Sequence, residues 1–238
     1  MKLHLTLVTT SLLALAQVAA NAGSPWSALL KKIPQTEHFT SLFNGTDLTG
    51  WDGDKKYWSV NNGAIRGANH AGTAVPSSSY LFTNGSYREF RLLLEVRQTM
   101  SAKHSTMHSA VGALGERFTD KGDNKHGFRG PLLMFCHDWG IWDAYRRNRT
   151  IPPNHRGTLN ITAENKGGWN LVEILVVGNR IRFVANGQLV FDFTDKAEML
   201  QTSPIGLQLH SNNRPQEYHF RGLVLTTTPT DQLLSLQP

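Results

Sequence analysis

The chain has 238 residues and a formal net charge of +6 at pH 7, from 24 Lys and Arg against 18 Asp and Glu. Its single cysteine, Cys136, excludes an intrachain disulfide, so a hydrophobic core has to supply the stability. We interpret Cys136 as a small buried residue, with a reactive thiol as the alternative. The basic cluster at Arg146, Arg147 and Arg149 lacks the interleaved aromatic residues that stack on single-stranded nucleic acid, so we expect no nucleic-acid partner.

Residues 1–22 have the pattern of a secretory signal peptide. Lys2 provides a positive start, residues 5–20 are largely apolar, and Ala20-Asn21-Ala22 forms an A-x-A cleavage site. The apolar stretch is shorter than the ~20 residues that a membrane-spanning helix needs. We therefore expect a secreted, extracellular protein that begins near Gly23 and has no membrane attachment once the signal is removed.

After residue 22 the sequence first has a helical pattern and then, from Phe39 onward, β-strand patterns. Residues 23–38 form an N-terminal segment with one short expected helix, which Pro34 ends. From Phe39 onward strand and turn signals dominate, and Asn62-Gly63 between two β-rich runs predicts a hairpin. In FRLLLEVR (90–97), apolar residues occupy one face of a strand and a half-charged set occupies the other. We expect the half-charged face to be solvated or to form the floor of a polar groove.

The clearest pattern is WNLVEILVVGNRIRFVANGQLVFDF, residues 169–193. Gly178-Asn179 and Asn186-Gly187 supply the positive φ angles of two-residue hairpin loops, so this stretch predicts a three-stranded antiparallel meander. A single meander cannot bury its own apolar face and requires a second sheet. With the remaining β-rich runs we expect roughly ten to twelve strands in an all-β antiparallel sandwich over residues 39–228, followed by a C-terminal tail at 229–238.

Six stretches, taken in order, resemble the successive motifs of the 3-keto-disaccharide hydrolase family, whose members are also described as 3-keto-glucoside 1,2-lyases and hydratases. They are LFNGTDLTGW (42–51), WSVNNGAIRG (58–67), YLFTNGSYREFRLLLEVR (80–97), GGWNLVEILVVGNRIRFVANGQLV (167–190), IGLQLH (205–210) and FRGLVL (220–225). The resemblance spans nearly all of residues 39–228. It implies a concanavalin A-like (jelly-roll) β-sandwich whose concave sheet holds a carbohydrate, here an oxidised di- or oligosaccharide or a glycoside.

The sequence departs from the family pattern where activity is expected. Members usually carry N-S-G-[IV], and the matching residues 108–111 read HSAV. Members then carry G-x-E-x-Q-x-x-D, whereas residues 130–137 read GPLLMFCH, with Leu132 in place of the glutamate and Met134 in place of the glutamine. The substrate-binding residues that the resemblance implies, together with a tryptophan suited to stacking on a sugar, are Glu95, Arg97, Ser109, Trp139 and Gln208.

The family's chemistry is an elimination followed by hydration. A ketone at C3 acidifies the hydrogen on C2, so a base removes it and the glycosidic oxygen leaves from C1. This route needs a base with a pKa near neutrality and a group that holds the enolate oxygen. His137, Asp138 and His210 are the candidates for base, orienting group and substrate ligand. A divalent metal ion is an alternative holder of the enolate oxygen.

Each of these residues also has a structural interpretation. His-Asp at a strand end is more often a hydrogen-bonded turn pair than a catalytic dyad, and His210 is also suited to capping the end of its strand. Trp139 and Trp142 suit core packing as well as sugar stacking. His104 and His108 have the i, i+4 spacing of helical metal sites, but nothing nearby predicts a helix, so we do not expect zinc there.

Two hypotheses about function follow. One is a secreted glycoside hydrolase or lyase acting on 3-keto-glycosides, and the other is a non-catalytic secreted carbohydrate-binding protein on the same fold. The E-x-D-x-x-E strand of concanavalin-like glucanases is missing from the sequence, which argues against a two-carboxylate glycosidase. Glycosylation is expected at N-x-S/T sequons if the source is eukaryotic. The sequons begin at Asn44, Asn84, Asn148 and Asn160.

Overall fold

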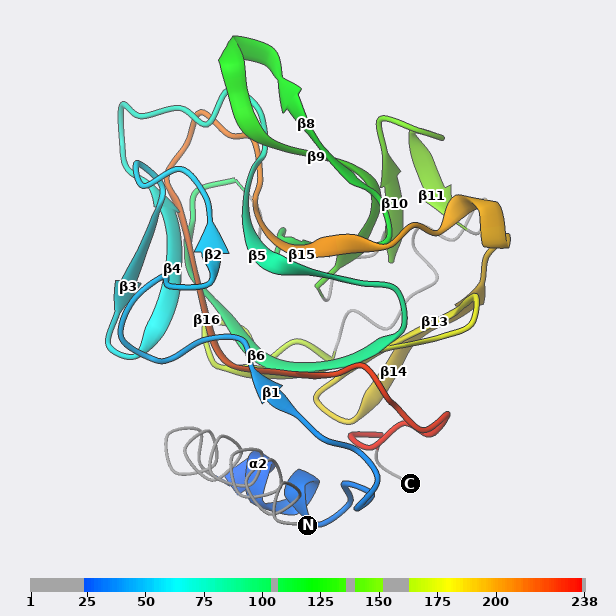
Figure 1. Cartoon of the computed structure of the whole chain (residues 1–238). Helices are drawn as coiled ribbons and strands as arrows, with labels where there is room; N and C mark the ends of the chain where they lie inside the picture. The colour runs from blue at the N-terminus through cyan, green and yellow to red at the C-terminus, as the bar shows by residue number, and fades with distance from the viewer. Residues whose placement is uncertain (1–23, 104–106, 136–139, 152–162, 237–238) are drawn as a thin grey trace, which may run out of the picture.

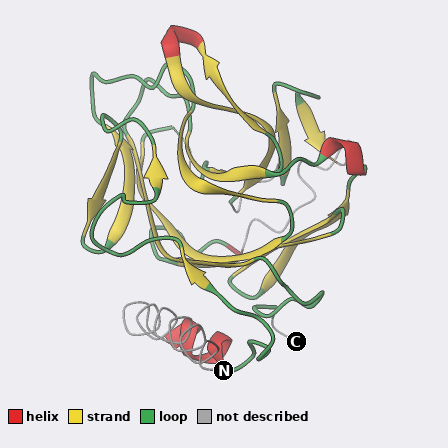
Figure 2. Cartoon of the chain, in the orientation of Figure 1, coloured by secondary structure: helices red, strands yellow, loops and turns green. Residues whose placement is uncertain are grey.

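The computed structural model describes residues 24–103, 107–135, 140–151 and 163–236. Over these residues the chain forms two antiparallel sheets packed face to face, with very little helix (Figure 1, Figure 2). The expected all-β sandwich is therefore confirmed. Within the described residues the α-helix is α2 (Ser24–Leu30), and no helix there has the length and apolar character needed to cross a membrane.

The first sheet, sheet A, contains the predicted meander. Its strand order is β14-β13-β12-β6-β16-β4-β3, with β1 paired to β16. Its strands are β1 (Thr40–Ser41), β3 (Trp58–Asn61), β4 (Ala64–Asn69), β6 (Phe90–Ser101), β12 (Asn170–Val177), β13 (Arg180–Ala185), β14 (Gln188–Thr194) and β16 (Gln216–Thr226). Asn186 and Gly187 both have positive φ, as a tight hairpin requires, and β12, β13 and β14 are consecutive neighbours.

The second sheet, sheet B, has the order β11-β10-β9-β7-β15-β5-β2, and β8 pairs with β9 as a hairpin beyond the sheet (Figure 1). Its strands are β2 (Trp51–Asp52), β5 (Ser79–Tyr87), β7 (Ala110–Gly112), β8 (Glu116–Asp120), β9 (Asn124–Met134), β10 (Ile141–Ala144), β11 (Arg149–Ile151) and β15 (Ser203–Leu209). Two 3-10 turns are described, η1 (Lys121–Asp123) in the β8–β9 hairpin and η3 (Ala197–Met199) before β15.

The main core lies between the two sheets. Alternate residues of the long strands point into it, for example Leu92 and Leu94 of β6, Ile174 of β12 and Leu207 of β15, all fully buried. Burial of this many aliphatic and aromatic side chains is the main favourable term in folding. It provides the stability that the chain cannot obtain from a disulfide.

The outer face of sheet A carries a second, smaller core. Trp26 and Leu29 of α2, Leu93 of β6 and Leu234 near the C-terminus are buried together there. In Figure 1, α2 and the C-terminal end lie against the same side of the molecule, below sheet A. The half-charged face of residues 90–97 is therefore neither solvated nor the floor of a groove at this end, because α2 and the segment around Leu234 cover it.

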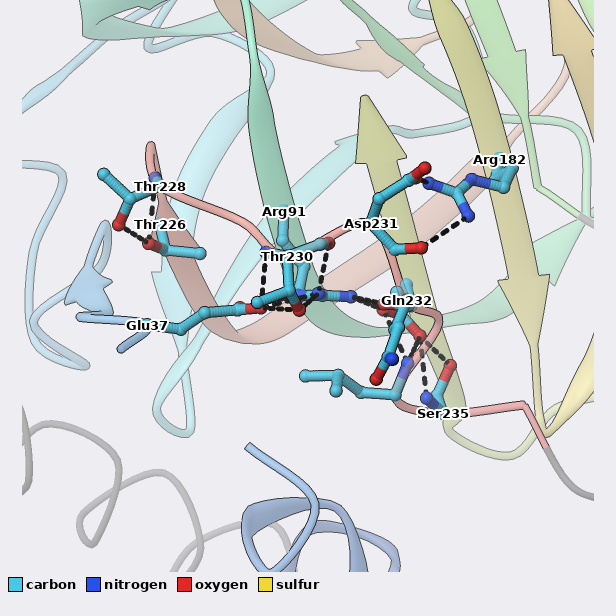
Figure 3. A network of polar contacts seen from close by, with 11 residues as sticks. Glu37, Arg91, Arg182, Thr226, Thr228, Thr230, Asp231, Gln232 and Ser235 are labelled. Carbon is cyan, nitrogen blue, oxygen red and sulfur yellow. Dashed lines mark hydrogen bonds and ion pairs between the residues drawn. The ribbon is translucent and has the colours of Figure 1, made fainter. Parts of the chain in front are cut away.

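A buried ionic network fixes the two chain ends to this face (Figure 3). The Arg91 guanidinium is fully buried and donates from Nε and Nη2 to the Glu37 carboxylate, each at 2.8 Å, and from Nη1 to Glu173. The Glu173 carboxylate also accepts the backbone N–H groups of Leu234 and Ser235. Segments from both ends of the sequence thus depend on one arginine of β6.

Candidate functional site

The outer face of sheet B carries a cavity of about 250 Å³. One side is apolar and is formed by Leu132, Met134, Trp142 and Ala144. The other side is polar and is formed by Ser78, Tyr80, His108, Gln208, His210 and Ser211, with Tyr145 and Asn148 completing the lining. This volume lies just below the usual range of ligand pockets and suits a single sugar ring with a small substituent.

Strand register explains the polarity of the cavity. Met134 of β9 pairs with Ala110 of β7, and Gln208 of β15 pairs with Tyr80 of β5. The register Leu207↔Val111 sets β7 beside β15, so these four residues form one row across the sheet. Because side chains alternate between faces, all four point away from the main core. The row runs from an apolar residue on β9 to polar residues on β15 and β5.

Two glycines shape the neighbouring row. A Cβ on Gly206 would lie 2.7 Å from the Phe82 ring, and a Cβ on Gly112 would lie 3.0 Å from the Phe128 ring. The rings of Phe82 and Phe128 therefore occupy the space above these glycines, with their centroids 6.3 Å apart. The aromatic packing fills this part of the outer face and leaves the cavity beside it.

Tyr80 and Gln208 are joined by a hydrogen bond, in which Gln208 Nε2 donates to the Tyr80 hydroxyl at 2.9 Å. Both side chains are 2% exposed. The Tyr80 oxygen accepts here, so its own proton is available to another acceptor, and burial raises the pKa of Tyr80 so that this proton is retained. Gln208 Oε1 is buried and has no hydrogen-bond partner in the described part of the chain. The pair thus offers a bound molecule one donor and one acceptor.

His108 and His210 meet at the cavity. Their rings are in edge-to-face contact, with centroids 4.4 Å apart. Neighbouring side chains hold both backbones: Tyr218 donates to the His108 carbonyl at 3.1 Å, and Gln216 donates to the His210 carbonyl at 2.5 Å. His108 is 3% exposed whereas His210 is half-buried, so His210 is the more accessible imidazole.

Ser109 stands behind the cavity rather than in it. Its hydroxyl donates to the Gln208 carbonyl at 2.6 Å, and the side chain is fully buried. This bond continues the pairing of β7 with β15 and fixes the strand that carries Gln208. The structure therefore places Ser109 as a support for a lining residue, and not as a residue that faces the cavity.

Glu95 and Arg97 lie elsewhere. They point outward from sheet A, where Glu95 accepts from Arg221 at 2.7 Å. Arg97 and Arg221 stack on the Trp169 ring, at 4.5 Å and 4.0 Å from its centroid. Glu95 and Arg97, which the resemblance implies as substrate-binding residues, therefore do not line the cavity on the outer face of sheet B.

His137, Asp138 and Trp139 lie outside the described residues, as does Cys136. The described chain ends at Phe135 and resumes at Gly140, whose carbonyl accepts from Met134 N–H at 2.8 Å. Trp142 lines the cavity and also packs against the apolar cluster of β5, β7 and β9. It thus occupies a position open to a ligand.

Sequence patterns do not point to Tyr80 or Tyr145 as site residues. Tyr145 is 56% exposed, with a φ of +61°, and its hydroxyl donates to Asp120 at 2.9 Å. Partial burial and the Asp120 carboxylate raise the pKa of Tyr145 to about 12. Alternation with Leu81 identifies Tyr80 as outward-facing, but only the pairing of β5 with β15 brings it to Gln208.

Two further features concern possible ligands. Among the described residues, no group of three or more His, Cys, Asp or Glu side chains is arranged to hold a metal ion. A larger and separate hollow of about 440 Å³ is lined by residues of loops, of η1 and of the start of β9, among them Lys56, Lys121 and Lys125. It contains none of the predicted site residues, so the smaller cavity, which holds Gln208 and His210, is the candidate site.

The sandwich with this cavity belongs to the class of concanavalin A-like folds. The model of the 3-keto-alpha-glucoside-1,2-lyase-like domain family matches residues 38–226, and the chain belongs to that family. The resemblance found in the sequence is confirmed, and membership links the chain to carbohydrate chemistry. No curated protein matches the sequence.

Solved structures share the fold at low sequence identity. A candidate glycosyl hydrolase from Parabacteroides distasonis is 20% identical, with a TM-score of 0.52 over 79% of this chain and 98% of that chain. A second such protein from that organism is 18% identical, with a TM-score of 0.50 over 80% and 94%. The VIP36 exoplasmic/lumenal domain, in its Ca²⁺- and mannose-bound form, is 10% identical, with a TM-score of 0.52 over 81% and 91%. These likenesses establish the sandwich fold alone.

Proposed function

We propose that the protein is a secreted enzyme that cleaves 3-keto-glycosides by elimination and hydration. The observation that carries this proposal is the meeting of the histidine pair with the Tyr80–Gln208 pair at one sugar-sized cavity, in a chain of this family. Acid–base groups and oriented hydrogen-bond partners at one small cavity are what proton abstraction next to a ketone needs.

The reaction has two steps. A base takes the proton from C2, the C2 electrons form a C1=C2 bond, and the bond from C1 to the glycosidic oxygen breaks. The leaving alcohol is protonated, and the remaining enone keeps the C3 ketone. Water then adds across the C1=C2 bond, with hydroxide bonding to C1 and a proton returning to C2. The net change is hydrolysis of a 3-keto-glycoside to a 3-keto-sugar and an alcohol.

The residues take separate roles. His137, which lies outside the described residues, is the proposed base and Asp138 its orienting carboxylate. Of the two histidines at the cavity, His210 binds the substrate from the wall, and His108 supports the His210 ring by edge-to-face contact. The protonated Tyr80 hydroxyl donates to the C3 oxygen, which gains negative charge as C2 loses its proton. Gln208 Oε1 accepts a hydrogen bond from a sugar hydroxyl, which satisfies an otherwise unpaired buried acceptor among the described residues.

A carbohydrate-binding protein without catalysis is the second candidate. Leu132 and Met134 stand where the family pattern has a glutamate and a glutamine, and both line the cavity. A site in which apolar residues replace two polar residues can still have a cavity that fits a sugar, but it has fewer hydrogen bonds to that sugar. The mannose-bound VIP36 domain is an example of a sugar-binding protein with the same fold.

The test uses methyl 3-keto-glucoside in D₂O, with and without an added divalent metal ion. Wild-type protein is expected to release methanol and to incorporate deuterium at C2. His137→Ala should lose both, His210→Ala should mainly raise KM, and His38→Ala, at an exposed histidine, should change neither. Loss of deuterium incorporation in His210→Ala but not in His137→Ala would transfer the role of base to His210. Sugar binding without turnover under any condition would establish the non-catalytic candidate.

A further inference from the structure

We propose that the cavity selects glycosides whose leaving group is an apolar ring rather than a second sugar. This inference rests on the proposed function, because it names the substrate class of the same site. It concerns the wall of the cavity formed by Leu132, Met134 and Trp142, which the proposed catalytic steps do not use.

The apolar wall is continuous and well packed. Leu132 and Met134 alternate along β9 on the outward face, and Trp142 of β10 lies directly opposite Leu132 in the strand register. Leu132 is 4% exposed and Met134 is 2% exposed. Sugar hydroxyls placed here would lose their hydrogen bonds to water without replacement, whereas an apolar ring would lose nothing and bury its surface.

The polar wall fixes which end of a substrate faces which side. Tyr80 and Gln208 supply a donor and an acceptor at the opposite end of the cross-strand row from Met134. A sugar ring with its ketone toward these two residues directs its glycosidic bond away from them. The leaving group then lies along β9 and β10, on the apolar wall.

The lining beside this wall is also suited to an apolar group. Tyr145 lines the cavity with more than half of its surface exposed, and its ring packs against Phe118 with centroids 5.0 Å apart. The hydrogen bond to Asp120 fixes its hydroxyl. An aromatic face held in this way extends the contact for a ring that protrudes from a cavity of about 250 Å³.

The decisive measurement compares two 3-keto-glucosides of the same anomeric configuration, one with cyclohexanol and one with glucose as the leaving alcohol. A sugar hydroxyl is the more acidic alcohol, so leaving-group chemistry by itself favours the disaccharide. We expect kcat/KM to be about 10- to 100-fold higher for the cyclohexyl substrate. This preference can then come only from contacts that the protein makes with the ring.

Substitutions in the apolar wall test whether its side chains cause the preference for the cyclohexyl substrate. Leu132→Gln and Met134→Gln should each bring the two kcat/KM values closer together, while Leu189→Gln, at a leucine that is 40% exposed and outside the cavity, should leave their ratio unchanged. Thermal unfolding confirms that each variant is folded. If Leu132→Gln does not fold, Met134→Gln alone decides the question.

The outcomes separate this inference from the proposed function. Equal kcat/KM values for the two substrates in the wild type would overturn the inference and leave the proposed enzyme intact. If neither substrate is cleaved, the proposed enzyme fails, and calorimetry with unoxidised cyclohexyl glucoside and a glucose disaccharide decides the inference. Tighter binding of the cyclohexyl glucoside then supports the apolar wall, and equal or weaker binding overturns it.

Discussion

Tyr80 and Gln208 are hydrogen-bonded to each other across β5 and β15, with Nε2 of the glutamine 2.9 Å from the tyrosine hydroxyl. The bond uses one donor of Gln208 and one acceptor site of Tyr80, and it leaves the tyrosine proton and the glutamine Oε1 for a ligand. Because both side chains are buried, their orientation is fixed before any sugar arrives. Such preorganisation is what electrostatic stabilisation of a developing enolate requires.

The first prediction concerns Tyr80→Phe. The change removes the proposed donor to the C3 oxygen, so we expect kcat/KM for methyl 3-keto-glucoside to fall by about 100-fold or more. It also leaves Gln208 Nε2 buried without its acceptor, which should cost about 1 to 3 kcal/mol in the free energy of unfolding. Steady-state kinetics and urea unfolding measure the two effects.

Tyr57→Phe is the matched control for this change. Its hydroxyl likewise takes part in a hydrogen bond, which it donates to the Ala74 carbonyl at 3.1 Å in a partly buried position, but Tyr57 does not line the candidate site. Tyr57→Phe should lower the free energy of unfolding and leave kcat/KM for methyl 3-keto-glucoside unchanged. Full activity in Tyr80→Phe would remove the tyrosine from the mechanism.

The fold could be predicted because its signals are local. Asn62-Gly63 and Asn186-Gly187 have the positive φ angles that their hairpins need, and the alternation in β6 separates a core face from an outer face. The sequence did not show what covers the outer face. The partners of Arg91 are Glu37, 54 positions away, and Glu173, 82 positions away, and no local pattern links such residues.

The site was predictable only in part, for the same reason. Gln208 and His210 are two residues apart on one run, so alternation places them on one face. Tyr80 is 128 positions from Gln208 and reaches it through strand pairing that the sequence does not reveal. Glu95 and Arg97 share a face as expected, but alternation cannot say which sheet that face belongs to or what lies on it.

The second prediction is that the mature protein is exported and begins near Gly23. The A-x-A site at Ala20-Asn21-Ala22 follows an apolar stretch of signal-peptide length. Intact-mass measurement of protein from the culture medium should give a chain without residues 1–22. A deletion of residues 5–20 should keep the protein inside the cell, and secreted material that still carries Met1 would contradict the prediction.

The third prediction concerns the buried network on sheet A. Arg91→Ala leaves the Glu37 and Glu173 carboxylates buried without their shared cation, so we expect a loss of about 3 to 5 kcal/mol in the free energy of unfolding. Arg180→Ala breaks an exposed ion pair with Asp192 and should cost no more than about 1 kcal/mol. Urea unfolding at pH 7 measures the loss in free energy of unfolding for each variant. Similar losses in both variants would show that the network does not hold the chain ends in place.

The last prediction concerns acid stability and Glu217. Burial raises the pKa of this carboxyl, but hydrogen bonds from His219, Arg66 and Thr99 outweigh burial and bring the pKa down to about 2, from an ordinary value of 4.5. A carboxyl whose pKa is depressed by folding stabilises the folded state above its unfolded pKa. That contribution is lost as the pH falls from 4.5 to about 2.

Glu217→Gln should therefore be less stable than the wild type by roughly 2 to 3 kcal/mol at pH 7, and the difference should shrink as the pH falls and nearly vanish at about pH 2. Urea unfolding of both proteins across this range measures the difference directly. Glu198→Gln is the control, because it removes a carboxylate from an exposed position and shows the effect on stability of losing one negative charge. A stability difference between wild type and Glu217→Gln that stays constant from pH 7 to pH 2 would show that the ionised carboxylate is not what His219, Arg66 and Thr99 stabilise, because only a charged group loses its contribution on protonation.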